Sequence, residues 1–231
     1  SNATEGFGQY NTFIANHARI SGAALGWMHA QGISITNYTF INNTAEKSGG
    51  AIYIGPESHY CNIIDSVFTG NHVTNFGTNN YGGAIDCQAS NTTIKGTTFN
   101  ENYAVSGGAI YIASPSGTTN ISTSKFNHNN ATNGHGGAIA LESSAVSVNE
   151  SSFNYNTAKE GGAIYVGGMS ITNYIYNSNF TENNATNGNG GAVDWVASSG
   201  HIIDSRFIRN HAIYGGGVYM GGSSSNSNII N

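Results

Sequence analysis

The sequence predicts an all-β chain, a right-handed parallel β-helix of about eight coils with roughly 27 residues in each coil. Three observations support this fold class. The motif Phe-x-x-Asn occurs eight times, most often at steps of 27 residues. A glycine-rich start to a short apolar run follows each copy, and no stretch of the chain keeps a helical period. A unit of this length cannot bury its own apolar face, but it can when it stacks on copies of itself.

The first element of each coil is a short strand centred on the phenylalanine of the motif. The phenylalanines are Phe13, Phe40, Phe68, Phe99, Phe126, Phe153, Phe180 and Phe207. We expect them to form one buried column. The asparagines three residues later are Asn16, Asn43, Asn71, Asn102, Asn129, Asn156, Asn183 and Asn210. We expect their amides to stack into a ladder, because identical side chains lie above one another in stacked parallel strands.

The second element is the glycine-rich strand. Six copies read Gly-Gly-Ala-Ile or Gly-Gly-Ala-Val, and they begin at Gly49, Gly82, Gly107, Gly136, Gly161 and Gly190. The fourth and sixth residues of every copy are apolar, so alternation along a strand places them on one wall of a core. The two glycines suit a corner with positive φ or a close approach between backbones.

The third element is an apolar position five residues before each phenylalanine. It is occupied by Ile35, Ile63, Ile94, Ile121, Val148, Ile175 and Ile202. Each coil should therefore contain three short strands. With a rise of about 4.8 Å per coil, eight coils would form a rod of roughly 38 Å. We expect right-handed coiling from the crossover rule for parallel strands.

The domain organisation follows from the extent of the repeat. Residues 1–3, Ser-Asn-Ala, look like a scar from tag removal, and residues 4–231 form one β-helix domain. The chain ends within a repeat, so we expect it to be a fragment of a longer repeat protein. The exposed strand edges at its ends are expected to permit end-to-end association.

Composition argues against several function classes. Charged residues make up 8% of the chain, compared with about 25% in ordinary globular proteins, and Lys and Arg total 7. No basic stripe suits nucleic acid, and no apolar run approaches the roughly 20 residues of a membrane span. Cys61 and Cys87 lie at apolar positions, where we expect them to be buried as small hydrophobes; whether they form a disulfide stays open.

Catalytic acids on adjacent coils would be the mark of a polysaccharide-active β-helix enzyme. No two acids are neighbours within one column of equivalent positions. Asp86 and Asp194 are four coils apart, about 19 Å, whereas a glycosidase pair needs roughly 5–10 Å. We therefore expect no enzyme and no cofactor or metal. Acids from different columns could still meet across a groove, so a lyase or hydrolase stays an alternative.

A column of tyrosines and aspartates is the strongest candidate binding site. The outward position of the glycine-rich strand carries Tyr53, Asp86, Tyr111, Tyr165, Asp194 and Tyr219. On a flat exposed face, tyrosine rings would stack on sugar rings and the aspartates would accept hydroxyl hydrogen bonds. The alternative is that tyrosine only favours exposed strand positions. A second candidate is the enlarged turn 73–81, with Phe76, because insertions on a solenoid often mark its binding face.

The motifs Phe-x-x-Asn and Gly-Gly-Ala-Ile resemble the repeats of chlamydial polymorphic outer-membrane proteins. The Asn-rich setting is similar to the large adhesin-like surface proteins of methanogenic archaea. The resemblance covers residues 13–220 and implies an exported, right-handed β-helix that contacts other cells or surfaces. The expected function is thus non-enzymatic binding of a surface glycan or protein of another cell, at an extracellular location. A passive stalk that only projects another domain is a further alternative.

Overall fold

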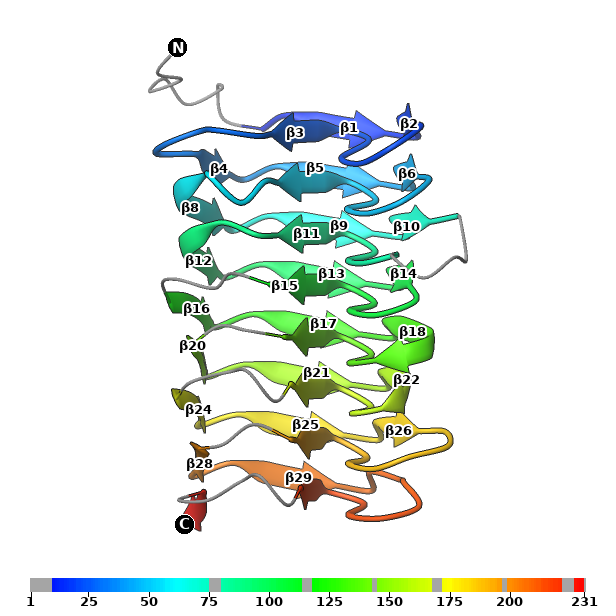
Figure 1. The fold of residues 1–231 in the computed structure, drawn as a ribbon, viewed down its shortest axis with the longest axis vertical. Coiled ribbons are helices and arrows are strands. Elements are labelled where there is room, and N and C mark those ends of the chain that lie inside the picture. Colours follow the sequence, from blue (N-terminus) through cyan, green and yellow to red (C-terminus); the bar gives the residue numbers. More distant parts are fainter. Residues whose placement is uncertain are drawn as a thin grey trace.

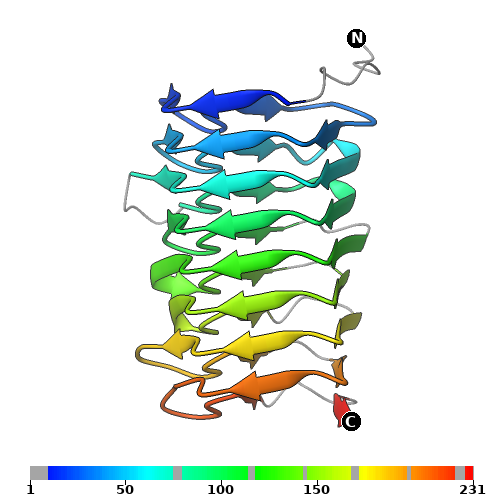
Figure 2. The same cartoon turned by 180° about the vertical axis from the view of Figure 1, so that it is seen from behind.

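The chain folds as a rod of stacked coils. The computed structural model describes residues 10–74, 80–113, 118–142, 145–167, 172–196, 199–221 and 227–230. Figure 1 shows the coils in sequence order from the N-terminal to the C-terminal end, and Figure 2 shows the opposite face of the same rod. The result is an all-β parallel solenoid of about seven turns, with about 27 residues in each turn, as predicted.

Two sheets carry the predicted phenylalanine and glycine-rich strands. The Phe sheet consists of β1 (Thr12–Ile14), β5 (Thr39–Ile41), β9 (Val67–Thr69), β13 (Thr98–Asn100), β17 (Lys125–Asn127), β21 (Ser152–Asn154), β25 (Asn179–Thr181) and β29 (Arg206–Ile208). The Gly-Gly sheet consists of β3 (Leu25–Trp27), β7 (Ile52–Ile54), β11 (Ile85–Cys87), β15 (Ile110–Ile112), β19 (Ile139–Leu141), β23 (Ile164–Val166), β27 (Val193–Trp195) and β30 (Val218–Met220). They form two opposite faces of the rod, as Figures 1 and 2 show.

Two further sheets close the coil. The Ile sheet, which holds the predicted isoleucine column, consists of β4 (Ser34–Thr36), β8 (His59–Ile64), β12 (Ser90–Lys95), β16 (Thr118–Ser122), β20 (Ala145–Asn149), β24 (Thr172–Tyr176), β28 (Ser199–Ile203) and β31 (Asn228–Ile230). The corner sheet consists of β2 (His17–Ala18), β6 (Thr44–Ala45), β10 (His72–Val73), β14 (Tyr103–Ala104), β18 (Asn130–His135), β22 (Thr157–Glu160) and β26 (Asn184–Ala185). The prediction of three strands per coil was therefore wrong by one, because most corner strands are only two residues long and carry no apolar alternation.

The core is built from the three predicted apolar columns. Successive phenylalanine rings stack with centroids 4.6–5.1 Å apart along the whole Phe sheet. The inward residues of the Gly-Gly sheet and the isoleucine column pack against them in one continuous buried cluster. Cys61 and Cys87 are both buried in this core as free thiols.

The asparagine ladder forms as predicted. In each step the side-chain amide donates to the carboxamide oxygen of the next asparagine, as in Asn129 Nδ2 to Asn156 Oδ1 at 3.0 Å. The same amide also donates to a phenylalanine carbonyl of the preceding coil, here Phe99 O at 3.0 Å. The ladder thus satisfies backbone groups at a buried corner where strand pairing is interrupted.

Both glycines of the Gly-Gly motif are required by the backbone. Gly136 has φ of +66°, a conformation that side chains with a Cβ rarely adopt. Gly137 has an ordinary φ, but a Cβ there would lie 2.6 Å from the backbone nitrogen of Thr157 in the next coil. The first glycine therefore makes the turn, and the second permits the close approach of coils.

Candidate functional site

The outward side chains of the Gly-Gly sheet form one column, which we call the strand column. Its members in chain order are Gly26, Tyr53, Asp86, Tyr111, Ala140, Tyr165, Asp194 and Tyr219. The register places each member directly beside the next. The six strand-column residues predicted from the sequence therefore do lie in one column, in the predicted order.

The expectation of a flat, exposed tyrosine face was wrong. Asp86 and Asp194 are each 1% exposed, and Tyr111 is 8% exposed. The physical reason is a second column of side chains beside the first. Phe76, the remaining predicted ligand-binding residue, lies outside the described residues, as do residues 75–79 of its turn.

The second column, which we call the loop column, comes from the residue just before the positive-φ glycine that leads into each strand of the Gly-Gly sheet. Its members are Ser21, Ser48, Tyr81, Ser106, His135, Glu160, Asn189 and Tyr214. Because the glycine reverses the chain, each loop-column residue returns alongside the strand column. We call the surface that the two columns share the Gly-Gly groove; hollows open in it beside Ser21, Gly26 and Tyr53 and beside Tyr81, Ser106 and Tyr111.

Two stacked aromatic pairs bridge the columns. Tyr81 stacks on Tyr111 with ring centroids 4.1 Å apart and planes inclined by 13°. His135 stacks on Tyr165 with centroids 4.3 Å apart and an angle of 26°. Each pair joins a loop-column ring to the strand-column ring of the following coil.

A hollow of about 450 Å³ opens between these pairs, and Tyr81, Val105, Ser106, Tyr111, Asn133, Gly134, His135 and Glu142 line it. Its cause is the size of Ser106, which stands in the loop column between the larger Tyr81 and His135. The hydroxyl of Ser106 accepts a hydrogen bond of 3.2 Å from the backbone nitrogen of His135. Such a volume lies within the usual range for small-ligand pockets.

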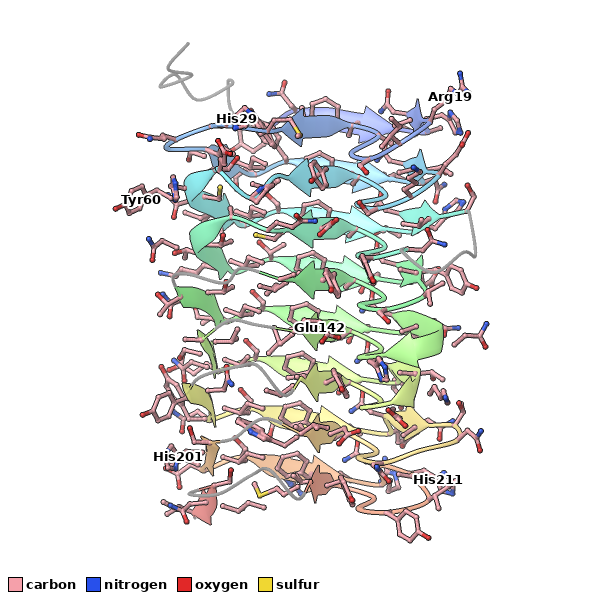
Figure 3. All side chains as sticks on the ribbon, in the orientation of Figure 1. Arg19, His29, Tyr60, Glu142, His201 and His211 are labelled. Carbon is pink, nitrogen blue, oxygen red and sulfur yellow. The ribbon has the colours of Figure 1, made fainter. Side chains whose placement is uncertain are left out.

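Glu142 supplies the carboxylate of the hollow. It follows the end of β19, and Figure 3 shows it midway along the rod on the Gly-Gly face. Gly167 of the next coil leaves room for it, since a Cβ there would lie 2.8 Å from Glu142 Oε2. Burial raises the pKa of Glu142 above its ordinary value. No hydrogen bond or ion pair connects this carboxylate to any other residue that the structure describes.

The strand-column aspartates are buried acids without full partners. Asp86 Oδ2 accepts a hydrogen bond of 3.3 Å from Gln88 Nε2, while Oδ1 has no partner among the described residues. Burial raises the pKa of Asp86 to about 7, against the opposing effect of hydrogen bonds from Ser48 and Gln88. For Asp194, burial and then the charge of Glu160 raise the pKa to about 7.

His135 is the basic group of the hollow. Its Nδ1 lies 3.1 Å from Glu160 Oε2 in the next coil. Burial lowers the pKa of His135 although Glu160 opposes this effect, and the charge of Lys159 lowers it further. The imidazole is therefore neutral near neutral pH.

The groove can present aromatic faces and acceptor oxygens to a ligand. The described residues contain no group of three His, Cys, Asp or Glu side chains that could hold a metal ion. They also contain no helix long and apolar enough to cross a membrane. The charge of Glu160 in the loop column acts on Asp194 in the strand column, which comparison within single columns could not detect.

Sequence reasoning missed the loop column and Glu142. The signal was present, because the loop-column residue always stands five positions before the strand-column residue. It was not recognised because the loop column mixes Ser, Tyr, His, Glu and Asn and shows no conserved type. Only the turn geometry reveals that the two positions face each other.

Comparison with known proteins identifies the coil type. Residues 37–55, 96–113 and 150–167 match the family model of the Chlamydia polymorphic membrane protein repeat. Each matched segment contains one Phe-x-x-Asn motif and the Gly-Gly motif that follows it, so the resemblance predicted from these motifs is confirmed. No curated protein and no solved structure gives a match to the chain. The likeness to adhesin-like proteins of methanogenic archaea stays a prediction.

Proposed function

We propose that this chain is the β-helical part of a non-enzymatic cell-surface protein that binds a surface glycan of a partner cell through its Gly-Gly groove. Its repeats support the surface location, since the matched family consists of membrane proteins of Chlamydia. The observation that carries the binding role is the hollow between the Tyr81–Tyr111 and His135–Tyr165 pairs. Aromatic faces beside hydrogen-bonding groups suit sugar rings, which have apolar faces and hydroxyl edges.

A glycan array tests this proposal. The parent chain should retain a defined set of glycans, with weak affinity per site that rises with ligand length because several modest contacts act together. The variant Tyr81→Ala should reduce retention at least about fivefold, since Tyr81 lines the hollow and the loss of an aromatic anchor costs more than about 1 kcal/mol.

The matched control is Tyr60→Ala. Tyr60 is 62% exposed and projects from the Ile-sheet side of the rod, away from Glu142, as Figure 3 shows. It should bind like the parent, and circular dichroism should show that both variants stay folded. Equal loss in the two variants would contradict the groove as the binding site. No retained glycan would favour the stalk, and turnover of a polysaccharide would favour the enzyme.

A further inference from the structure

The hollow has a marked charge asymmetry. None of the described residues that line it is Lys or Arg, whereas Glu142 is one of them. The hollow is therefore an aromatic-walled space in which Glu142 is the carboxylate that a ligand would meet.

This combination suits a cation better than a neutral group. A half-buried carboxylate without a partner gains most from a ligand that brings a positive charge and hydrogen-bond donors. The ring faces of Tyr81 and Tyr111 add cation–π attraction when the cation is partly removed from water. His135 does not oppose this, because burial lowers its pKa and the imidazole is neutral near neutral pH.

The size and polarity of the hollow indicate which class of molecule would bear the positively charged group. A volume of about 450 Å³ is far larger than an ammonium group needs. The remaining lining offers the hydroxyl of Ser106, the amide of Asn133 and the apolar faces of the stacked tyrosines. Hydroxyl partners next to a flat apolar surface match a sugar ring.

We propose that the hollow binds a sugar unit carrying a free, protonated amino group, with the ammonium between Glu142 and the Tyr81–Tyr111 pair. This inference rests on the proposed glycan-binding function and specifies its ligand class. It predicts a preference for amino sugars over their N-acetylated forms, since acetylation removes the charge and keeps the ring.

Calorimetric titration with a short glucosamine oligomer and with its N-acetylated counterpart of equal length tests the preference. Below the pKa of the sugar amine, the free-amine oligomer should bind the parent at least about tenfold more tightly. Glu142→Gln should remove this preference while the fold, followed by circular dichroism, is unchanged. Glu101→Gln, an equal change of net charge at an exposed residue of another corner, should leave the preference intact.

Each other outcome would overturn the inference. Equal affinity for the two oligomers, or binding of neither while the array retains other glycans, would remove the amine preference but leave the proposed function standing. Equal loss in the Glu142 and Glu101 variants would show general attraction of a polycation to an acidic chain. A lysine-containing peptide that competes as strongly as the glucosamine oligomer would show that the sugar ring is not recognised.

Discussion

At the scale of single residues, a core side chain packs against the residues at the same repeat position in the two neighbouring coils. Phe126 is fully buried, and its ring stacks on Phe99 at 4.9 Å and on Phe153 at 4.7 Å. Such a residue packs against two copies of itself, so its loss leaves a cavity that the neighbouring rings cannot fill without shifting their own coils.

We therefore expect Phe126→Ala to lower the free energy of unfolding by about 3–5 kcal/mol in a chemical melt. Tyr155→Ala is the control, because Tyr155 is 45% exposed and its ring stacks on the exposed corner residue His128 rather than in the core. It should cost less than about 1 kcal/mol. A loss below about 1 kcal/mol for Phe126→Ala would mean that the phenylalanine column does not form the core.

The buried aspartate of the groove gives a pH-dependent prediction. Burial raises the pKa of Asp86 to about 7, so in the folded chain its carboxyl keeps a proton that the unfolded chain releases near pH 4. The effect of Asp86 on the free energy of unfolding should therefore become less favourable to folding as pH rises from about 4 to about 7. Above about pH 7 this effect should be constant.

Asp86→Asn removes this contribution with little change in shape. The variant should match the parent near pH 4 and exceed it by about 1–4 kcal/mol near pH 8, as measured by chemical melts at both values. If the substitution instead destabilised the chain near pH 8, Asp86 would be ionised and paired in the folded state.

At the scale of the element, two polar ladders hold the corners between sheets. In the asparagine ladder, Asn129 Oδ1 accepts from both the backbone nitrogen and the side-chain amide of Asn102, each at 3.0 Å. A second ladder lies two residues before each phenylalanine from Phe68 to Phe207: the Ser124 hydroxyl donates to Ser122 O at 2.8 Å and accepts from the backbone nitrogen of Thr97 at 3.2 Å. The ladders satisfy backbone groups that the short strands leave unpaired.

Asn129→Ala tests the first ladder. It leaves two donors of Asn102 without their acceptor inside the rod, so we expect a loss of at least about 2 kcal/mol in the free energy of unfolding. Asn127→Ala is a matched control, because Asn127 belongs to a half-buried amide row in which water can replace its bond of 3.0 Å to Asn100. A cost below about 1 kcal/mol is expected there. Similar costs for the two variants would show that the buried ladder adds no particular stability.

The elements also show where prediction from the sequence succeeds. The phenylalanine, isoleucine and Gly-Gly strands were predictable because each places one residue type at one position in every coil. The serine ladder at Ser124, Ser151 and Ser178 was not predicted, and two-residue corner strands such as β6 carry no pattern of their own. Their pairing is decided by the coil closing around the core.

At the scale of the whole molecule, stacking of the coils places equivalent residues of successive repeats side by side on one surface. The order of residues in the strand column could be predicted from the sequence, but the solvent exposure of their side chains could not. Asp86 and Asp194 are buried because loop-column side chains return beside them through glycine turns. The groove depends on which side chain is small at which coil, as with Ser106 between Tyr81 and His135. Such differences between coils are averaged away when repeats are aligned.

Hydrogen exchange with and without a glycan retained by the array tests most directly whether the groove of this β-solenoid is its binding surface. Bound glycan should slow exchange in β15, β19 and β23 and in the loop-column segment around His135, because these form and flank the hollow. The Ile sheet should be unaffected. Protection confined to the Ile sheet, to the corner sheet outside the groove or to the ends of the rod would contradict the assignment.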